Sequence, residues 1–503
     1  MKTPSNEIFR KYTTAETFEK IVEYPSVSAM WEHCVSAYGS AQAICDDGNT
    51  YTYAETEAAA ASFRGALLEA HQGASRRVGI YCPNSFDFVK SFLAITTLGF
   101  TAVILPAQLD AGSVFGCCMK YNIGTLVYHP ALEENTALAA QRCPALKLLR
   151  TDAEGAPAAL RPCDASVPCV AMFTGGTTGK SKAALLSNGA VMQGVVNGCY
   201  GYQDVFHQRY LLVLPLSHVF GLIRNLMTSL YTGSSLFICR NNKDMFRDIA
   251  MFRPTIFVIV PALAEMALTL SKKFGKNMLG ADLKYIICGA AAVSPYLITE
   301  YRNFGITVVP GYGLTESANL VSGNPECVEK PDSVGLMYPN QEYRIENGEL
   351  WLKGANMLDG YVGEEEEAYT DGWFRTGDLV RVDEDGFLYI TGRIKEIIVL
   401  SNGENVSPAQ VEASFNELTF VQDSQVFEDV LENGKHILAL EIVPRMTELA
   451  KLGLEDPNAY MMQELERVNH TLPGHERVNR IVIRDSDFAR TPSMKIVRYK
   501  KCN

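Results

Sequence analysis

A glycine-rich segment constrains the possible fold and chemistry of this chain more than any other feature. The ten residues from Phe173 to Lys182 hold three glycines, three threonines and two lysines. They directly follow an apolar run, Val170–Phe173, that is typical of a buried strand. Glycines let a backbone approach an anion closely, and backbone N–H groups, hydroxyls and ammonium groups donate to phosphate oxygens. The segment therefore predicts a phosphate-binding loop at the end of a strand.

Two other interpretations of this loop are weaker. The Walker A pattern, GxxxxGK followed by Ser or Thr, fits Gly179-Lys180-Ser181 but puts Thr174 where its first glycine should stand. The next residues, Lys182–Ser187, are typical of a strand, whereas a P-loop leads at once into a helix. A plain glycine turn remains an alternative, but it would not need so many phosphate donors.

Short apolar runs alternate with helical patterns through the first part of the chain. Ala54–Ala70 and Ser85–Leu98 are predicted helices, and Arg77–Tyr81 and Thr101–Leu105 are predicted strands. This succession favours a parallel α/β sheet. Similar predicted strands recur at Leu211–Leu214, Leu236–Cys239, Ile256–Val260 and Tyr285–Cys288.

The pattern changes after about Gly335, where short strands with turn residues between them predict a small antiparallel unit. These strands are Tyr343–Ile345, Glu349–Lys353, Leu379–Val382 and Phe387–Ile390. The last segment, Lys395–Asn503, has the size of one small domain. The predicted fold class is α/β, with a large N-terminal domain of mixed, mostly parallel sheets and the antiparallel β unit. A small, mobile α+β C-terminal domain follows it.

Composition excludes several classes of protein. The net charge of −12 argues against a general nucleic-acid binder, because no basic field attracts phosphate over the surface. The 13 cysteines are odd in number and form no CxxC pair, which suits reduced thiols. The N-terminus lacks the apolar core of a signal peptide, and the uncharged stretch Ser91–Leu109 is broken by threonines, a glycine and a proline. We therefore expect a cytoplasmic protein without an integral membrane segment.

Further segments carry chemistry, and each has a plainer alternative. In Gly311–Ser317, the residues Thr-Glu-Ser could be a helix N-cap. In Trp373–Leu379, the aspartate could close a hairpin, or it could accept hydrogen bonds from vicinal hydroxyls. The basic segment Arg490–Arg498 could simply be solvated. Gly392-Arg393 follows a predicted strand.

In this order, from Phe173 to Arg498, these segments resemble the acyl-adenylate-forming, or AMP-binding, superfamily. That superfamily includes acyl-CoA synthetases, firefly luciferase and the adenylation domains of nonribosomal peptide synthesis. Phe173–Gly179 and Ile398–Ser407 look most like bacterial long-chain fatty acyl-CoA ligases. The resemblance implies ATP and Mg²⁺ as cofactors and coenzyme A as a co-substrate.

The resemblance also assigns roles around the nucleotide. It places Tyr312 near adenine, Thr315 at the α-phosphate and Glu316 on the magnesium, which prefers one or two carboxylates plus substrate phosphates. Asp378 would grip the ribose hydroxyls, and Arg393 would contact ribose or phosphate. The full set of expected nucleotide or CoA contacts is Thr174, Gly175, Gly176, Thr177, Thr178, Gly179, Lys180, Lys182, Gly289, Ala290, Ala291, Gly311, Tyr312, Gly313, Asp378, Arg393, Lys395 and Gly403.

Lys495 would be the catalytic lysine, with its ammonium between the substrate carboxylate and the α-phosphate. The resemblance divides the chain into residues 1–394, with the acid and ATP sites, and residues 395–503, a lid that turns about Lys395. Rotation would withdraw Lys495 and present the segment around Gly403 to the thiol. Two departures stand out, because Met494 and Ala183 occupy positions where the family commonly has glycine.

Leu214–Leu222 resembles the wall of the acid pocket. It has no aspartate to pair an amino acid's ammonium, so an amino acid substrate is disfavoured. His218 is either a pocket gate or a satisfied core histidine. The predicted function is a stand-alone, ATP-dependent carboxylic acid–CoA ligase for a fatty or other hydrophobic acid. The alternatives are a ligase that loads an acyl carrier protein and a non-catalytic sensor of ATP or acyl-adenylate.

Overall fold

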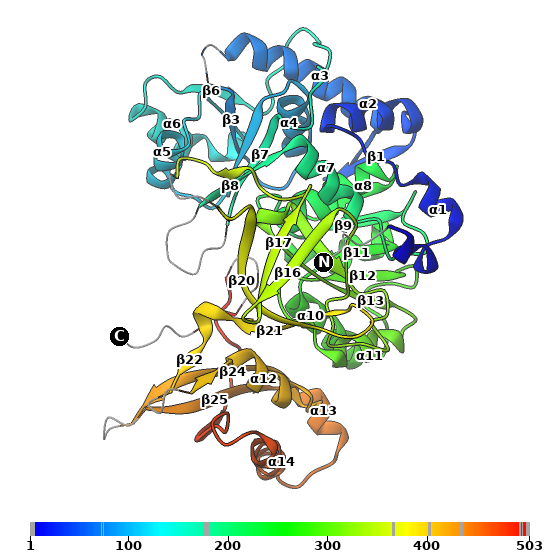
Figure 1. The fold of residues 1–503 in the computed structure, drawn as a ribbon. Helices are drawn as coiled ribbons and strands as arrows, with labels where there is room; N and C mark the ends of the chain where they lie inside the picture. Colours follow the sequence, from blue (N-terminus) through cyan, green and yellow to red (C-terminus); the bar gives the residue numbers. More distant parts are fainter. Residues whose placement is uncertain are drawn as a thin grey trace.

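A computed structural model describes residues 6–71, 73, 75–174, 182–364, 368–400, 404–431, 436–491, 494 and 496–498. Figure 1 shows two large sheets with helices between and around them, and a smaller unit at the C-terminal end of the chain. The described helices are α1 (Ala15–Lys20), α2 (Val27–Tyr38), α3 (Tyr53–Ala70), α4 (Phe86–Thr97), α5 (Ala111–Lys120), α6 (Glu133–Gln141), α7 (Asn188–Asn197), α8 (Thr228–Tyr231), α9 (Met245–Phe252), α10 (Pro261–Phe274), α11 (Pro295–Arg302), α12 (Pro408–Asn416), α13 (Met446–Lys451) and α14 (Pro457–Thr471).

The first large sheet has seven strands in the order β18-β8-β7-β4-β3-β5-β6. The five from β7 to β6 run parallel, and β8 and β18 are antiparallel to their neighbours. The central strands are uninterrupted apolar runs because helices or loops cover both faces of a parallel sheet. Their bounds are β3 Arg77–Tyr81, β4 Thr101–Leu105, β5 Thr125–Tyr128, β6 Lys147–Arg150, β7 Pro168–Phe173, β8 Ala183–Ser187 and β18 Gly360–Tyr361.

The second large sheet has nine strands in the order β15-β14-β13-β12-β11-β9-β10-β1-β2. The six from β13 to β1 are parallel, so their carboxyl ends meet at one edge. The bounds are β1 Gln42–Asp46, β2 Asn49–Thr52, β9 Arg209–Leu212, β10 Ser235–Ile238, β11 Ile256–Ile259, β12 Tyr285–Cys288, β13 Thr307–Leu314, β14 Asn319–Gly323 and β15 Leu336–Met337.

Helices join the two sheets into one core. Helix α4 contacts β3 and β4 of the first sheet and β1 of the second, and α7 contacts β7, β8 and β14. Helices α10 and α11 pack together beside the second sheet, where α11 contacts β13 (Figure 1). Helix α3 begins at a capping box, in which the Thr52 hydroxyl accepts from the Glu55 N–H and the Glu55 carboxylate accepts from the Thr52 N–H.

The antiparallel unit is the sheet β16-β17-β20-β19, with β21 paired to β20. Its strands are β16 Gln341–Glu346, β17 Glu349–Gly354, β19 Tyr369–Thr370, β20 Trp373–Val382 and β21 Leu388–Arg393. The C-terminal unit has a hairpin, β22 (Ile398–Val399) with β23 (Asn405–Val406), and a three-stranded sheet, β24 (Val421–Val430), β25 (His436–Pro444) and β26 (Arg480–Ile483). Its own apolar core, which includes Ile398, Phe415 and Leu465, is separate from the core of the preceding residues.

Side chains of both units meet in a polar contact. Arg445, which directly follows β25, places its Nε 2.6 Å from Glu265 Oε1 on α10, and both side chains are buried. Lys272, on the same helix, lies 2.6 Å from Glu448 Oε1 on α13. We call these two ion pairs the α10–α13 contact.

The predicted fold class is confirmed. Several strands have other bounds than predicted. Strand β20 begins at Trp373 and not at Leu379, so it includes Asp378. The run Leu211–Leu214 was expected as a strand, but β9 ends at Leu212. Val213 and Leu214 are apolar because they line a hollow beyond the strand end, and not because they belong to the sheet. No helix among the described residues is long and apolar enough to cross a membrane.

Candidate active site

The end of β13 passes directly into a tight turn that carries Thr315 and Glu316. Thr315–Ser317 form a single 3-10 turn, so the alternative of a helix N-cap does not hold. The Ser317 hydroxyl accepts from the Leu314 N–H at 2.9 Å and fixes the turn. Only glycine fits at position 313, because a Cβ there would lie 1.9 Å from the Asn319 carbonyl oxygen. The turn therefore projects Thr315 and Glu316 from a strand end whose geometry is fixed.

A buried carboxylate, Asp378, lies beside this strand. The Tyr312 hydroxyl donates to Asp378 Oδ2 at 2.6 Å, and the Arg393 guanidinium pairs with the same carboxylate. Asp378 stands within β20, directly across from Arg393 on β21, so it does not close a hairpin. Burial, and then the Asp378 charge, raise the pKa of Tyr312, so its hydroxyl stays protonated and donates. Three expected nucleotide residues thus form one connected cluster.

Glu316 belongs to a second cluster, which includes the base of the glycine-rich segment. The Tyr361 hydroxyl, on β18, donates to Glu316 Oε1 at 2.9 Å. Lys182 Nζ lies 5.0 Å from the centre of the same tyrosine ring. The Thr174 N–H donates to the Lys182 carbonyl at 2.8 Å, which closes the base of the segment between them. The base of the predicted phosphate loop is therefore linked to Glu316 through Tyr361.

The Glu316 site fits a magnesium ion. Burial raises the pKa of this carboxyl, so a divalent cation would compensate a charge that the protein alone leaves costly. Among the described residues, no group of three or more His, Cys, Asp or Glu side chains could hold a metal by itself. A single carboxylate is sufficient when substrate phosphates complete the coordination of Mg²⁺.

A small hollow lies at the carboxyl ends of the parallel strands, where ligands bind in open α/β sheets. Its volume is about 20 Å³, which is room for roughly one water molecule. The lining residues follow β9, β10, β11 and β12, except for one that comes from the C-terminal unit. They are Val213, Leu214, Pro215, His218, Phe220, Asn242, Val260, Leu263, Ala290 and Met494.

His218, predicted on the acid-pocket wall, and Ala290, predicted as a nucleotide contact, both line this hollow. His218 Nδ1 accepts from the Phe220 N–H at 3.2 Å, so a neutral imidazole carries its proton on Nε2. Gly289 lies beside the hollow, since a Cβ there would come 3.4 Å from the ring of Phe220, which lines it. Ala291 is exposed and does not line the hollow.

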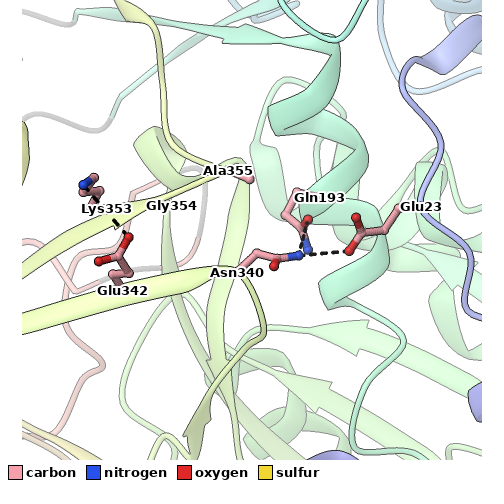
Figure 2. Close-up of a pocket in the computed structure, with 7 residues that line it drawn as sticks. All are labelled: Glu23, Gln193, Asn340, Glu342, Lys353, Gly354 and Ala355. Carbon is pink, nitrogen blue, oxygen red and sulfur yellow. Dashed lines mark hydrogen bonds and ion pairs between the residues drawn. The ribbon is translucent and has the colours of Figure 1, made fainter. Parts of the chain in front are cut away.

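A larger depression elsewhere, of about 490 Å³, shares no residue with these clusters. It is lined by Glu23, Gln193, Asn340, Glu342, Lys353, Gly354 and Ala355. Figure 2 shows that its side chains bond one another: the Asn340 amide donates to Glu23 at 2.9 Å and to Gln193 at 3.2 Å. Size alone therefore does not mark the site of chemistry here.

Several predicted residues lie outside the described ones: Gly175, Gly176, Thr177, Thr178, Gly179, Lys180, Gly403 and Lys495. Lys395 is described and lies in the 3-10 turn Ile394–Glu396, next to Arg393. Tyr361, which contacts both Glu316 and Lys182, is not among the predicted site residues, and Met494 was predicted only as a departure from glycine. No pattern around Tyr361 would have identified it, since its role depends on β18 pairing with β8.

Comparison with known proteins is consistent with this geometry. A family model described as AMP-binding enzyme matches residues 31–362, and one for the AMP-binding enzyme C-terminal domain matches residues 395–502. The chain is 29% identical over 400 residues to a feruloyl-CoA synthase of an Amycolatopsis species, which covers 75% of this chain and 80% of that protein. It is 28% identical over 390 residues to the long-chain-fatty-acid–CoA ligase FadD15 of Mycobacterium tuberculosis, covering 65% and 63%.

A solved structure shares the fold. The o-succinylbenzoate CoA synthetase of Bacillus subtilis, in complex with its acyl-adenylate intermediate, superposes with a TM-score of 0.77 at 22% identity, covering 95% of this chain and 98% of that one. The same synthetase has also been solved with ATP and a magnesium ion. At this identity the likeness concerns the fold.

Proposed function

This chain belongs to the AMP-binding enzyme family, and we propose that it is an AMP-forming acid–CoA ligase acting on a fatty or other hydrophobic carboxylic acid. The observation that carries the proposal is the Asp378 cluster, with Tyr312 and Arg393, at the strand end that also projects Glu316. The matched relatives are named for CoA thioesters of several different acids. The family therefore supports the reaction but leaves the acid open.

Adenylation is the first proposed step. An oxygen of the substrate carboxylate attacks the α-phosphorus of ATP, and pyrophosphate leaves with the electrons of the broken P–O bond. Asp378 accepts from the ribose hydroxyls, Thr315 and Lys182 contact phosphate, and Lys495 stabilises the charge on the pentacovalent phosphorus. Glu316 would hold Mg²⁺, which offsets charge on the departing pyrophosphate.

Thioester formation is the second step. The sulfur of coenzyme A attacks the acyl carbon of the mixed anhydride, the thiol proton is lost, and AMP leaves. We propose that residues 395–503 turn about Lys395 between the two steps, so that Lys495 leaves and Gly403 approaches the thiol. The separate apolar core that begins at Ile398 supports this division of the chain. The short turn Ile394–Glu396 between the strands is a suitable hinge.

The hollow beyond β9, β11 and β12 is the proposed acid site. Its walls are mostly aliphatic or aromatic, and His218 is one of the few polar residues among them. No carboxylate lines it among the described residues, so an amino acid's ammonium would be left unpaired at considerable cost.

The twelve described cysteines are free thiols, which supports a reducing compartment such as the cytoplasm.

Pyrophosphate release tests the function directly. The purified enzyme is given ATP, Mg²⁺ and one carboxylic acid at a time, with and without coenzyme A. We expect release that depends on a hydrophobic acid, and a CoA thioester only when coenzyme A is present. A thioester formed only on a purified acyl carrier protein would favour that alternative acceptor. Absence of release with every acid, from folded enzyme that binds ATP, would contradict the proposal and favour a sensor.

The ribose role of Asp378 gives a second prediction. Asp378→Ala removes the acceptor and leaves Arg393 without its partner, so ATP affinity should fall roughly ten- to a hundredfold. Wild-type enzyme should discriminate between ATP and 2′-deoxy-ATP, and the variant should not. Asp385→Ala, at an exposed turn residue, is the matched control and should bind both nucleotides as the wild type does. If the variant still preferred ATP over the deoxy analogue, the ribose assignment would fail.

A further inference from the structure

Met494 comes from the C-terminal unit but lies in the hollow of the large unit. It lines the same space as His218, Leu263 and Ala290. It is half-buried and packs against the apolar core of the preceding residues, not against the core of its own unit. A residue next to the predicted catalytic lysine therefore places an apolar side chain where the acid should bind.

The backbone at Met494 is unusual. Its φ is +63°, in the left-handed region that residues with a side chain seldom adopt. Ala290, which also lines the hollow, has a φ of +66°. Glycine would adopt this conformation at Met494 without cost, so a large side chain there is retained against a backbone preference. Such strain persists where surrounding structure holds it, most often at functional sites.

A network of hydrogen bonds holds Met494 in this position. Its N–H donates to the Thr491 carbonyl at 2.8 Å, and Arg490 Nη1 donates to the Met494 carbonyl at 3.3 Å. Arg490 is itself fixed to Asp423 on β24, at 2.6 Å, and to Asp487. The main chain at Met494 is thus tied to the sheet of the C-terminal unit, and the α10–α13 contact ties that unit to the helix that bears Leu263.

The space that remains beside Met494 is too small for an acyl chain. With the methionine in place, the hollow holds about 20 Å³, which is roughly one water molecule. A bound acid, even a compact one, must therefore displace the thioether from the hollow. A flexible methionine can yield to a compact group, but it competes more strongly with a group that fills the whole hollow.

We propose that Met494 is a specificity-determining residue, which restricts the acid to compact hydrophobic groups such as a short chain or a single ring. This inference rests on the proposed function, because it assigns the hollow to the acid. It is independent of the catalytic role of Lys495. It also gives a physical reason for a methionine at a position where the backbone favours glycine.

The test compares Met494→Gly, Met494→Ala and Met494→Leu with the wild type. Acid-dependent ATP–pyrophosphate exchange is measured with benzoate and with straight-chain acids from butanoate to hexadecanoate. Met494→Gly and Met494→Ala should raise kcat/KM for decanoate relative to butanoate by roughly tenfold or more. Met494→Leu keeps the volume and should keep the wild-type ratio. Met446→Ala, at an exposed methionine of the same unit, should also leave it unchanged.

The ratio of kcat/KM for decanoate to that for butanoate distinguishes a change in specificity from a purely structural effect. If Met494 only supported the backbone, all acids would lose activity together and the ratio would stay constant, which would overturn the inference. Equilibrium binding of decanoate keeps the inference testable if no acid supports exchange and the proposed reaction itself fails. Tighter binding to Met494→Gly than to the wild type, by about tenfold, would support it. Equal binding would overturn it.

Discussion

Lys495→Ala should slow acid-dependent pyrophosphate release by about two to three orders of magnitude. The ammonium is expected to stabilise charge that develops on the α-phosphate only in the transition state, so ATP affinity should change by no more than a few fold. Met494, the adjacent residue, lines the proposed acid site, which supports this placement. Single-turnover release with saturating ATP and acid measures the chemical step directly.

Three comparisons make the result specific. Thioester formation from a synthetic acyl-adenylate and coenzyme A should be nearly unaffected in Lys495→Ala, because the lysine acts only in the first step. Lys495→Arg should recover part of the rate, since it keeps the charge but not the compact ammonium geometry. Lys276→Ala, at an exposed lysine of the large unit, should behave as the wild type. If Lys495→Ala slowed both half-reactions equally, the proposal that Lys495 acts only in adenylation would be wrong.

The buried strands could be predicted because a short, uninterrupted apolar run indicates a strand that is buried on both faces. Arg77–Tyr81, Thr101–Leu105 and Tyr285–Cys288 have the same bounds in the structure as in the sequence analysis. Each runs inside a parallel sheet that is covered on both faces, so the apolar run begins and ends with the strand. Val213 and Leu214 are apolar because they line the hollow, so a prediction from the apolar run alone makes the strand two residues too long.

The contacts between distant segments could not be predicted in this way. Tyr361 meets Glu316 only because β18 pairs with β8, and Arg445 meets Glu265 across 180 residues of sequence. Neither pairing leaves a local pattern, since each depends on how whole elements dock. The same holds for Met494: the sequence shows that a glycine is missing, while the structure shows which space the side chain fills.

Breaking the α10–α13 contact is also expected to slow the enzyme strongly. Glu265→Leu would leave the Arg445 guanidinium buried without its carboxylate, a loss of about 3–5 kcal/mol for a broken buried pair. Arg445 would keep its hydrogen bonds to the carbonyls of Thr419 and Val421, so the C-terminal unit itself should stay folded. The loss would therefore fall on the docking of this unit against α10. We expect pyrophosphate release to drop by about a hundredfold or more, since 1.4 kcal/mol corresponds to roughly tenfold.

The second pair of the contact sets the conditions for this experiment. Burial raises the pKa of Glu448, but hydrogen bonds from Lys272, Lys451 and Tyr296 outweigh it and lower the pKa to about 2. Because the folded-state pKa is lower than the unfolded value of 4.5, the ionised Glu448 stabilises the fold at pH values above 4.5. This stabilisation is lost as the pH falls from 4.5 toward 2. The Lys272–Glu448 pair is therefore intact at neutral pH, and the measured change there reports the Glu265 pair.

The two half-reactions should respond differently to Glu265→Leu. The docking in this structure holds Met494 at the proposed acid site, and we propose that it belongs to adenylation. Thioester formation from a preformed acyl-adenylate uses the proposed second orientation, which does not need this contact, and it should be as fast as in the wild type or faster. The double variant Glu265→Leu/Arg445→Leu should regain part of the adenylation rate, since no charge is left unpaired. Glu342→Gln, at an exposed pair, is the control. If Glu265→Leu slowed both half-reactions equally, the pair would support folding in general, and the contact would not select one orientation of the C-terminal unit.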